Sequence, residues 1–145
     1  MGQAKDFMTP DPIVLESSAT ITEVVELFGS KKIASAPVRT SMGEYAGTLT
    51  ELTLVRILVL HQLQPEKYKK LAHRLDFLEP LVFVNQTDPF ADVLKAILKA
   101  PNHRLFVKEK NSHICGVISP KDLLRVLMTE TMEADTIKHE VKKLA

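Results

Sequence analysis

The chain contains an internal repeat, and this feature limits its possible folds more than any other. Shifting the sequence by 69 positions, which moves Ile13 onto Val82, aligns its two halves. A single copy of about 60 residues buries too small a fraction of its surface to be stably folded alone, so we expect the two copies to pack together. The aligned pairs include Leu15 with Val84, Val24 with Val93, Val38 with Val107, Gly47 with Gly116 and Thr50 with Ser119.

Each copy is expected to form the same β-α-β-β-α unit. Short apolar runs predict strands, and apolar residues at helical spacing predict helices. The fold class is therefore α+β, with two such repeats packed as a pseudo-two-fold pair. Strands are expected at 13–15, 35–39 and 44–49 and again at 82–84, 104–108 and 113–118, with closing helices at 51–63 and 120–129. The domain prediction is repeat 1 at 1–63, a linker helix at 64–78, repeat 2 at 79–129 and a helical tail at 130–145.

Charge and cysteine content exclude several classes of protein. The net charge is +1, from 19 Lys and Arg against 18 Asp and Glu, so the electrostatic signature of a nucleic-acid-binding protein is missing. The lone cysteine, Cys115, allows neither an internal disulfide nor a multi-cysteine zinc site, and no metal site is expected from the histidines. The apolar helix 51–63 is too short to span a bilayer. We expect a cytoplasmic protein without membrane insertion.

Several short strings, in a fixed order and repeated twice, carry a resemblance to a known family. In the first copy they are FMTP at 7–10, APV at 36–38 and GTLT at 47–50; in the second, GVISPKDLL at 116–124. Together they resemble the tandem cystathionine β-synthase (CBS) domain pair, or Bateman module. The resemblance covers residues 5–129 and implies a stand-alone CBS-domain protein.

The resemblance implies a ligand and a set of residues that bind it. Such pairs bind adenosine-containing ligands in the clefts between the repeats and regulate an attached or associated protein. The resemblance implies that the Ser and Asp of Ser-x-x-Asp bind the phosphate or ribose of the ligand. It implies that most of the remaining residues line the adenine. In the second copy these are Ser119, Asp122, His103, Arg104 and Phe83; in the first they are Thr50, Ser35, Ala34, Val14 and Thr9.

Two departures from the family pattern make the copies unequal. In the first copy, Thr53 stands where the family has Asp. The first copy therefore has no carboxylate at this position to accept hydrogen bonds from two ribose hydroxyls. Phe106 replaces the family's proline in the second copy, at the expected adenine wall. We therefore expect one good site, formed mainly by the second copy.

The chemistry of this site has a plainer alternative. Ser119-x-x-Asp122 is also a helix capping box, a stabilising device found in many proteins. A helix N-terminus with unpaired N–H groups equally suits a phosphate, so both interpretations stay open. His103 and Arg104 have a similar alternative as a solvated loop at the start of a strand.

No catalytic constellation is visible, so an enzyme is not expected and no catalytic cofactor is implied. The apolar residues of helix 51–63 run around nearly its whole circumference, which predicts burial on all sides. A second subunit would cover the outer face in a homodimer; the alternative is the other repeat's helices.

Two hypotheses follow for the function. In the first, the chain senses AMP, ADP, ATP or S-adenosylmethionine and modulates a partner protein that the sequence does not identify. In the second, it is a dimerisation or docking scaffold without a ligand.

Overall fold

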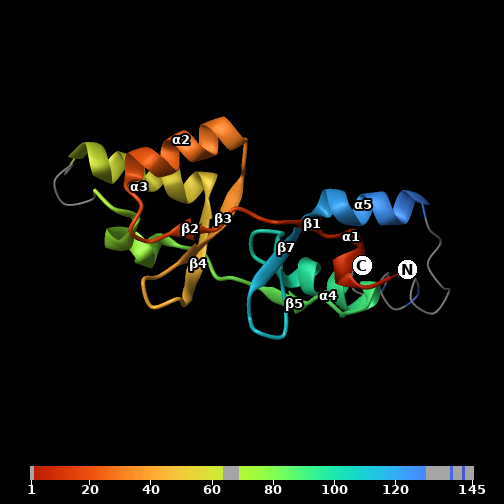
Figure 1. The fold of residues 1–145 in the computed structure, drawn as a ribbon. Helices are drawn as coiled ribbons and strands as arrows, with labels where there is room; N and C mark the ends of the chain where they lie inside the picture. Colours follow the sequence, from red (N-terminus) through yellow and green to blue (C-terminus); the bar gives the residue numbers. More distant parts are fainter. Residues whose placement is uncertain (1, 64–68, 130–137, 139–141, 143–145) are drawn as a thin grey trace. The chain divides into compact units, whose positions relative to one another are not determined.

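The computed structural model describes residues 2–63 and 69–129 together with residues 138 and 142, and these residues form two compact units (Figure 1). The first unit consists of residues 13–63 and 69–81. The second unit combines residues 2–12, here called the N-terminal segment, with residues 82–129. Residues 69–81 of the first unit are called the central segment.

The first unit is a three-stranded sheet covered on one face by helices. Its strands have the order β2–β3–β4, with β2 parallel to β3 and β3 antiparallel to β4. Helices α2 and α3 lie on the same side of the sheet (Figure 1), where their apolar residues meet it in one core that includes Ile21, Val38, Leu49, Ile57 and Leu71. The elements are β2 (Leu15–Glu16), α2 (Ile21–Lys31), β3 (Ser35–Arg39), β4 (Tyr45–Thr50), α3 (Glu51–Leu63) and the 3-10 helix η1 (Leu71–Phe77).

The second unit repeats this plan with one more strand. Its sheet has the order β1–β7–β6–β5, in which β1 is antiparallel to β7 and β5 is parallel to β6. The core includes an edge-to-face contact between Phe7 and Phe90, whose ring centroids are 5.5 Å apart. The elements are α1 (Ala4–Phe7), β1 (Thr9–Pro10), β5 (Phe83–Asn85), α4 (Phe90–Lys99), β6 (Leu105–Lys108), β7 (Ile114–Ile118) and α5 (Pro120–Thr129).

Each unit is completed by the segment that precedes the other repeat in the chain. The N-terminal segment precedes the first repeat but packs in the second unit, and the central segment precedes the second repeat but packs in the first. The same three backbone hydrogen bonds hold both segments. In the second unit they are Phe90 N to Gly2 O, Ala4 N to Asp88 O and Lys5 N to Gln86 O; in the first, Ile21 N to Lys69 O, Leu71 N to Ala19 O and Ala72 N to Ser17 O.

One glycine in each repeat allows this close approach. A Cβ atom at Gly47 would lie 2.8 Å from the carbonyl oxygen of Glu79, and a Cβ at Gly116 would lie 2.2 Å from the sulfur of Met8. Both distances are shorter than a carbon atom tolerates, so a side chain at either position would push the segment away. The repeated glycine therefore lets the segment approach the last strand of each repeat, β4 in the first unit and β7 in the second.

The α+β fold with two repeats is confirmed, and the strand and helix ranges agree with the predicted ranges to within about two residues. The prediction for residues 64–78 was a helix; of that range the structure describes residues 69–78, which contain the 3-10 helix η1 with a non-helical residue, Arg74, inside it. The predicted helical tail at 130–145 lies outside the described residues except for residues 138 and 142. The sequence prediction also missed α1 and β1.

Candidate functional site

Five of the predicted site residues gather at one end of the second unit's sheet. Because β7 is antiparallel to its neighbours β1 and β6, and β5 is parallel to β6, the end of β7 lies beside the starts of the other three strands. This end carries Ser119 and Asp122 after β7, Thr9 at the start of β1, Arg104 just before β6 and Phe83 at the start of β5. The topology thus supports part of the predicted grouping.

Asp122 is the centre of a hydrogen-bonded cluster at the N-terminus of α5. Its carboxylate oxygen Oδ2 accepts hydrogen bonds from the backbone N–H and the hydroxyl of Ser119, at 2.9 and 3.2 Å. The other oxygen, Oδ1, accepts from the hydroxyl of Thr9 at 3.2 Å and lies 3.6 Å from Nη1 of Arg125. The side chain of Asp122 is 3% exposed, whereas that of Arg125 is 70% exposed. A buried carboxylate is thus joined to two groups that a ligand could displace.

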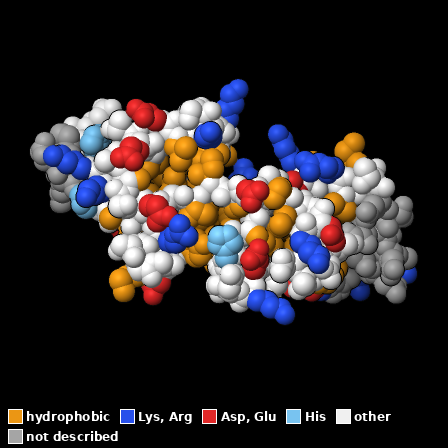
Figure 2. Space-filling view, viewed as in Figure 1, with side chains coloured by type: hydrophobic (Ala, Val, Ile, Leu, Met, Phe, Trp, Pro, Cys, Tyr) orange, Lys and Arg blue, Asp and Glu red, His pale blue; other side chains and the backbone are white. Residues whose placement is uncertain are grey.

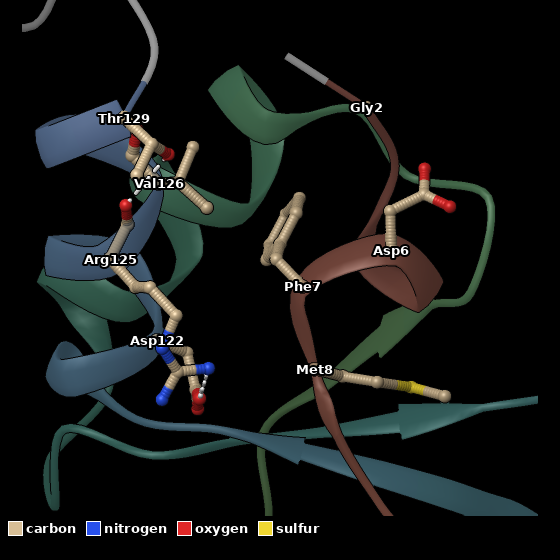
Figure 3. A pocket seen from close by; sticks show the side chains of 8 residues that line it. All are labelled: Gly2, Asp6, Phe7, Met8, Asp122, Arg125, Val126 and Thr129. Atoms are coloured by element: carbon tan, nitrogen blue, oxygen red, sulfur yellow. Dashed lines mark hydrogen bonds and ion pairs between the residues drawn. The ribbon is translucent and has the colours of Figure 1, made fainter.

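A pocket opens beside this cluster, between α1 and α5 (Figure 3). Its volume is about 470 Å³, within the range of about 300–1,000 Å³ that is usual for small-molecule sites. In Figure 3, Phe7 projects from α1 toward α5, while Asp6 lies on the far side of it from Asp122 and Arg125. The pocket is lined by Gly2, Asp6, Phe7, Met8, Asp122, Arg125, Val126 and Thr129.

The remaining predicted residues of the second copy have other neighbours. His103 has a φ of 55° and lines a separate apolar pocket of about 280 Å³ between α4 and α5. The backbone N–H of Arg104 donates to the side-chain oxygen of Asn102 at 3.3 Å. Nζ of Lys108 lies 5.4 Å from the ring centroid of Phe83.

The predicted residues of the first copy form a matching group at the end of the first unit's sheet. Ser35 pairs with Thr50 across β3 and β4, and the carbonyl oxygen of Ala34 accepts from the N–H of Glu51 at 3.2 Å. The hydroxyl of Thr50 accepts from the N–H of Thr53 at 3.2 Å and donates to the Thr53 hydroxyl at 3.0 Å. Thr50 thus caps α3 by accepting from the residue three positions on, whereas at α5 the residue three positions on, Asp122, accepts from Ser119.

Val14 and Thr9 have other neighbours. Val14 lines another pocket of the first unit, about 430 Å³ in volume, together with residues of β2 and α2. Thr9 was predicted with the first copy, but its hydroxyl is bonded to Asp122 of the second unit. The reason is that the N-terminal segment pairs with β7.

Two residues that sequence reasoning overlooked belong to these groups. Arg125 lies one helical turn after Asp122, a spacing of three residues that brings their side chains together on a helix. Glu79 corresponds to Thr9 when the segments 77–80 and 7–10 are aligned, and it pairs with Thr48 on β4. The segment alignment was the signal that could have identified Glu79.

The single cysteine, Cys115, lies on β7, in surroundings that disfavour its thiolate form. Burial, and secondarily the charge of Glu109, raises the pKa of the Cys115 thiol, which lowers its reactivity.

In the described ranges 2–63 and 69–129, no group of three or more His, Cys, Asp or Glu side chains is placed to hold a metal ion. None of the helices in the part of the chain that the structure describes is both long and apolar enough to span a membrane.

A family model for the CBS domain matches the chain twice, over residues 4–60 and 76–129. Among curated proteins, the chain is 21% identical over 128 residues to the 5'-AMP-activated protein kinase subunit gamma-3 of Sus scrofa and to that of Homo sapiens. The match covers 86% of this chain but 25% and 26% of those proteins. The chain therefore spans about a quarter of the length of the curated relatives it matches.

Solved structures of similar fold have low sequence identity. The chain superposes on CBSX2 in complex with AMP with a TM-score of 0.70 and 22% identity, covering 88% of this chain and 97% of that one. It superposes on the CBS-pair protein CBSX2 from Arabidopsis thaliana with a TM-score of 0.71 and 21% identity, covering 88% and 94%. At this identity the superpositions establish the fold.

Proposed function

The chain belongs to the CBS domain family, of which it carries two copies, and we propose that it is a non-catalytic regulatory module that binds an adenosine-containing ligand and modulates a partner protein. The observation that carries this proposal is the buried carboxylate of Asp122 at the N-terminus of α5, next to an open pocket. AMP is the first ligand to test, because the similar protein CBSX2 was solved in complex with AMP and the curated relatives are subunits of an AMP-activated kinase.

The proposed ligand replaces two existing partners of Asp122. A carboxylate has about four acceptor positions, so one oxygen can remain on Ser119 while the other accepts from ribose. The two ribose hydroxyls take the places of the Thr9 hydroxyl and the Arg125 guanidinium on Oδ1. Arg125 can then turn toward a phosphate group, which a guanidinium binds with two parallel hydrogen bonds.

Phosphate recognition has two further sources in the second unit. The first turn of α5 has backbone N–H groups with a partial positive charge, which favours anions. The second source is Arg104, whose guanidinium can pair with a phosphate group through two hydrogen bonds, whereas His103 is expected to line the adenine. The same groups accommodate AMP, ADP and ATP, whereas S-adenosylmethionine would use only the ribose contacts.

Isothermal titration with AMP, ADP, ATP and S-adenosylmethionine tests the proposal. We expect at least one adenylate to bind, and Asp122→Asn to weaken that binding by about tenfold or more, because a neutral amide accepts ribose hydroxyls more weakly than a carboxylate. Asp92→Asn, an exposed carboxylate on α4, is the matched control and should bind normally. Absence of binding at millimolar concentrations of all four compounds would overturn the sensor function.

The exposed face of α3 favours a second function, homodimerisation through helix 51–63. Thr53, Leu54 and Ile57 are buried, but apolar side chains on the outer face are more than half exposed. Figure 2 shows hydrophobic side chains gathered over the part of the first unit that contains α2 and α3. The outer residues are Leu52, Val55, Val59 and Leu63, at 58, 54, 55 and 73% exposure.

Analytical ultracentrifugation tests this assembly. We expect the wild-type chain to sediment as a dimer and the double variant Val55→Lys, Val59→Lys to sediment as a monomer, because charges on the outer face oppose its burial. Met42→Lys, which changes an exposed apolar residue in the β3–β4 loop, is the control and should leave the dimer intact. A monomeric wild-type chain would remove the dimer proposal without affecting ligand binding.

A further inference from the structure

The second unit has an apolar groove between α4 and α5, separate from the pocket beside Asp122. Two of its residues, Ile97 and Leu123, belong to the core and are buried. The residues at the surface, Leu98, Leu124 and Leu127, are 42, 57 and 40% exposed. Soluble proteins rarely leave a continuous apolar surface open to water, so a groove of this kind generally has an occupant.

The groove lies close to the point where the chain leaves α5. Leu124 and Leu127 stand on the last two turns of that helix, which ends at Thr129. Residues 130–145 follow directly in the sequence. The part of the chain nearest to the groove in sequence is therefore this C-terminal segment.

The C-terminal segment has the sequence pattern of an amphipathic helix. The structure describes residues 138 and 142 of this segment, and both have helical backbone and exposed side chains. They are lysines four positions apart, a spacing that places them on the same side of a helix. Apolar residues recur at intervals of three and four positions, which gives one apolar stripe: Ala134, Ile137, Val141 and Leu144.

Such a helix needs a surface on which to pack. Isolated helices shorter than about 12–15 residues are only marginally stable in water, and residues 134–145 form no longer stretch than this. A straight continuation of α5 does not supply the surface. The apolar positions 123, 124 and 127 of α5 would be followed on the same side by Glu130 and Thr131, which are polar.

The chain is long enough to turn back onto the groove. Residues 130–133 connect α5 to the first apolar position of the segment, and four extended residues span about 13 Å. Packed helices have axes about 8–10 Å apart, and antiparallel helices are commonly joined by about two to five residues. Attachment to α5 also gives the segment an effective concentration in the millimolar range, which favours it over a second copy of the chain as occupant.

We propose that residues 134–145 form a helix that packs antiparallel to α5 in the apolar groove of the same chain. Its apolar stripe covers the exposed side chains of Leu98, Leu124 and Leu127. The groove is thereby closed to other apolar surfaces, whereas the outer face of α3 in the first unit stays open for self-association. This inference does not depend on ligand binding.

Methyl NMR spectroscopy of the full chain tests the contact directly. We expect nuclear Overhauser contacts between the methyl groups of Ile137 and those of Leu124 or Leu127. A sample that mixes isotope-labelled and unlabelled chains distinguishes contacts within one chain from contacts between chains. The contacts of Ile137 should be absent from the spectrum that selects contacts between chains.

Hydrogen exchange at the amide of Leu144 measures how often the segment leaves the groove. The double variant Ile137→Gln, Val141→Gln should lower its protection about tenfold or more, because burial of one Val or Ile side chain changes an equilibrium constant by at least about that factor. The matched control, Lys138→Gln with Lys142→Gln, introduces the same residue at two exposed positions. It should change the protection by about twofold or less.

Every other result contradicts the proposal. If the contacts of Ile137 occur only between chains, a second copy occupies the groove. If Ile137 has no contact with α4 or α5, or if both double variants lower the protection equally, the segment does not pack there. Circular dichroism establishes that the variants are folded, and the wild-type NMR result is independent of them.

Discussion

The two repeats share a backbone arrangement more closely than they share side chains. Both hold a segment from elsewhere in the chain by the same three backbone hydrogen bonds, and both leave room for it with a glycine. At the helix N-terminus, however, the second unit has Asp122 bonded to Thr9, and the first unit has Thr53 bonded to Thr50. The difference shows that the scaffold tolerates a change of chemistry at the position where the ligand is proposed to bind.

The largest expected effect comes from adding a methyl group at the two equivalent glycines. In Gly47→Ala the new Cβ meets the carbonyl oxygen of Glu79 at 2.8 Å, and the paired backbone cannot move without losing its hydrogen bonds. We expect a loss of about 2–3 kcal/mol in the free energy of unfolding, as for other overpacked sites. In Gly116→Ala the obstacle is the flexible side chain of Met8, so we expect about 1 kcal/mol. Urea denaturation measures both; equal losses would contradict the comparison.

Alanine substitution at the N-termini of α5 and α3 should lower the free energy of unfolding by unequal amounts. Asp122→Ala removes the acceptor for Ser119 and Thr9, and hydrogen bonds to a charged group contribute about 1.5–3 kcal/mol, so we expect a loss of about 2 kcal/mol. Thr53→Ala removes a single neutral hydroxyl partner of Thr50 and should cost about 1 kcal/mol. Thermal unfolding at fixed pH distinguishes the two. A larger loss for Thr53→Ala would mean that the Asp122 cluster contributes little to folding.

Removal of the Thr9 hydroxyl tests how far the N-terminal segment depends on Asp122. Thr9→Val keeps the β1–β7 pairing but loses the hydrogen bond to Oδ1, for which we expect about 0.5–1 kcal/mol. Hydrogen exchange at the amide of Asp11, which donates to the carbonyl oxygen of Cys115, reports opening of this segment. Its protection should fall by about fivefold or less, and unchanged protection would show that backbone pairing alone fixes the segment.

The smallest effect is expected at Cys115, which corresponds to Ala46 in the first repeat. Its thiol makes one weak hydrogen bond, to the carbonyl oxygen of Val107 at 3.5 Å. Cys115→Ala should therefore change the free energy of unfolding by about 0.5 kcal/mol or less. A loss above about 1 kcal/mol, measured by urea denaturation, would indicate that the thiol packs in a way that the alanine of the first repeat does not reproduce.

The sequence was sufficient for the repeat, its strands and its helices, because apolar spacing and the alignment of Gly47 with Gly116 are local signals. It also gave the right neighbours for Asp122 and Ser119, since a spacing of three residues at a helix start brings their groups together. It could not give the partner of Thr9, because pairing between β1 and β7 joins residues more than a hundred positions apart. The alignment of residues 7–10 with 77–80 shows that Thr9 and Glu79 are equivalent. It identifies the partner of Thr9 only once the structure has shown that each segment packs against the other repeat.

The exchange of segments has a mechanical consequence. Residues 13–81 are inserted between two pieces of the second unit, so Gly2, near the start of the chain, and Thr129, at the end of α5, belong to one folded body. A stretching force applied between them, in an optical trap for example, first loads the second unit. The first unit bears no tension until the N-terminal segment has been pulled away from β7. The second unit is therefore expected to unfold before the first. Its unfolding adds to the extensible chain more than sixty residues, 13–81, that had carried no force.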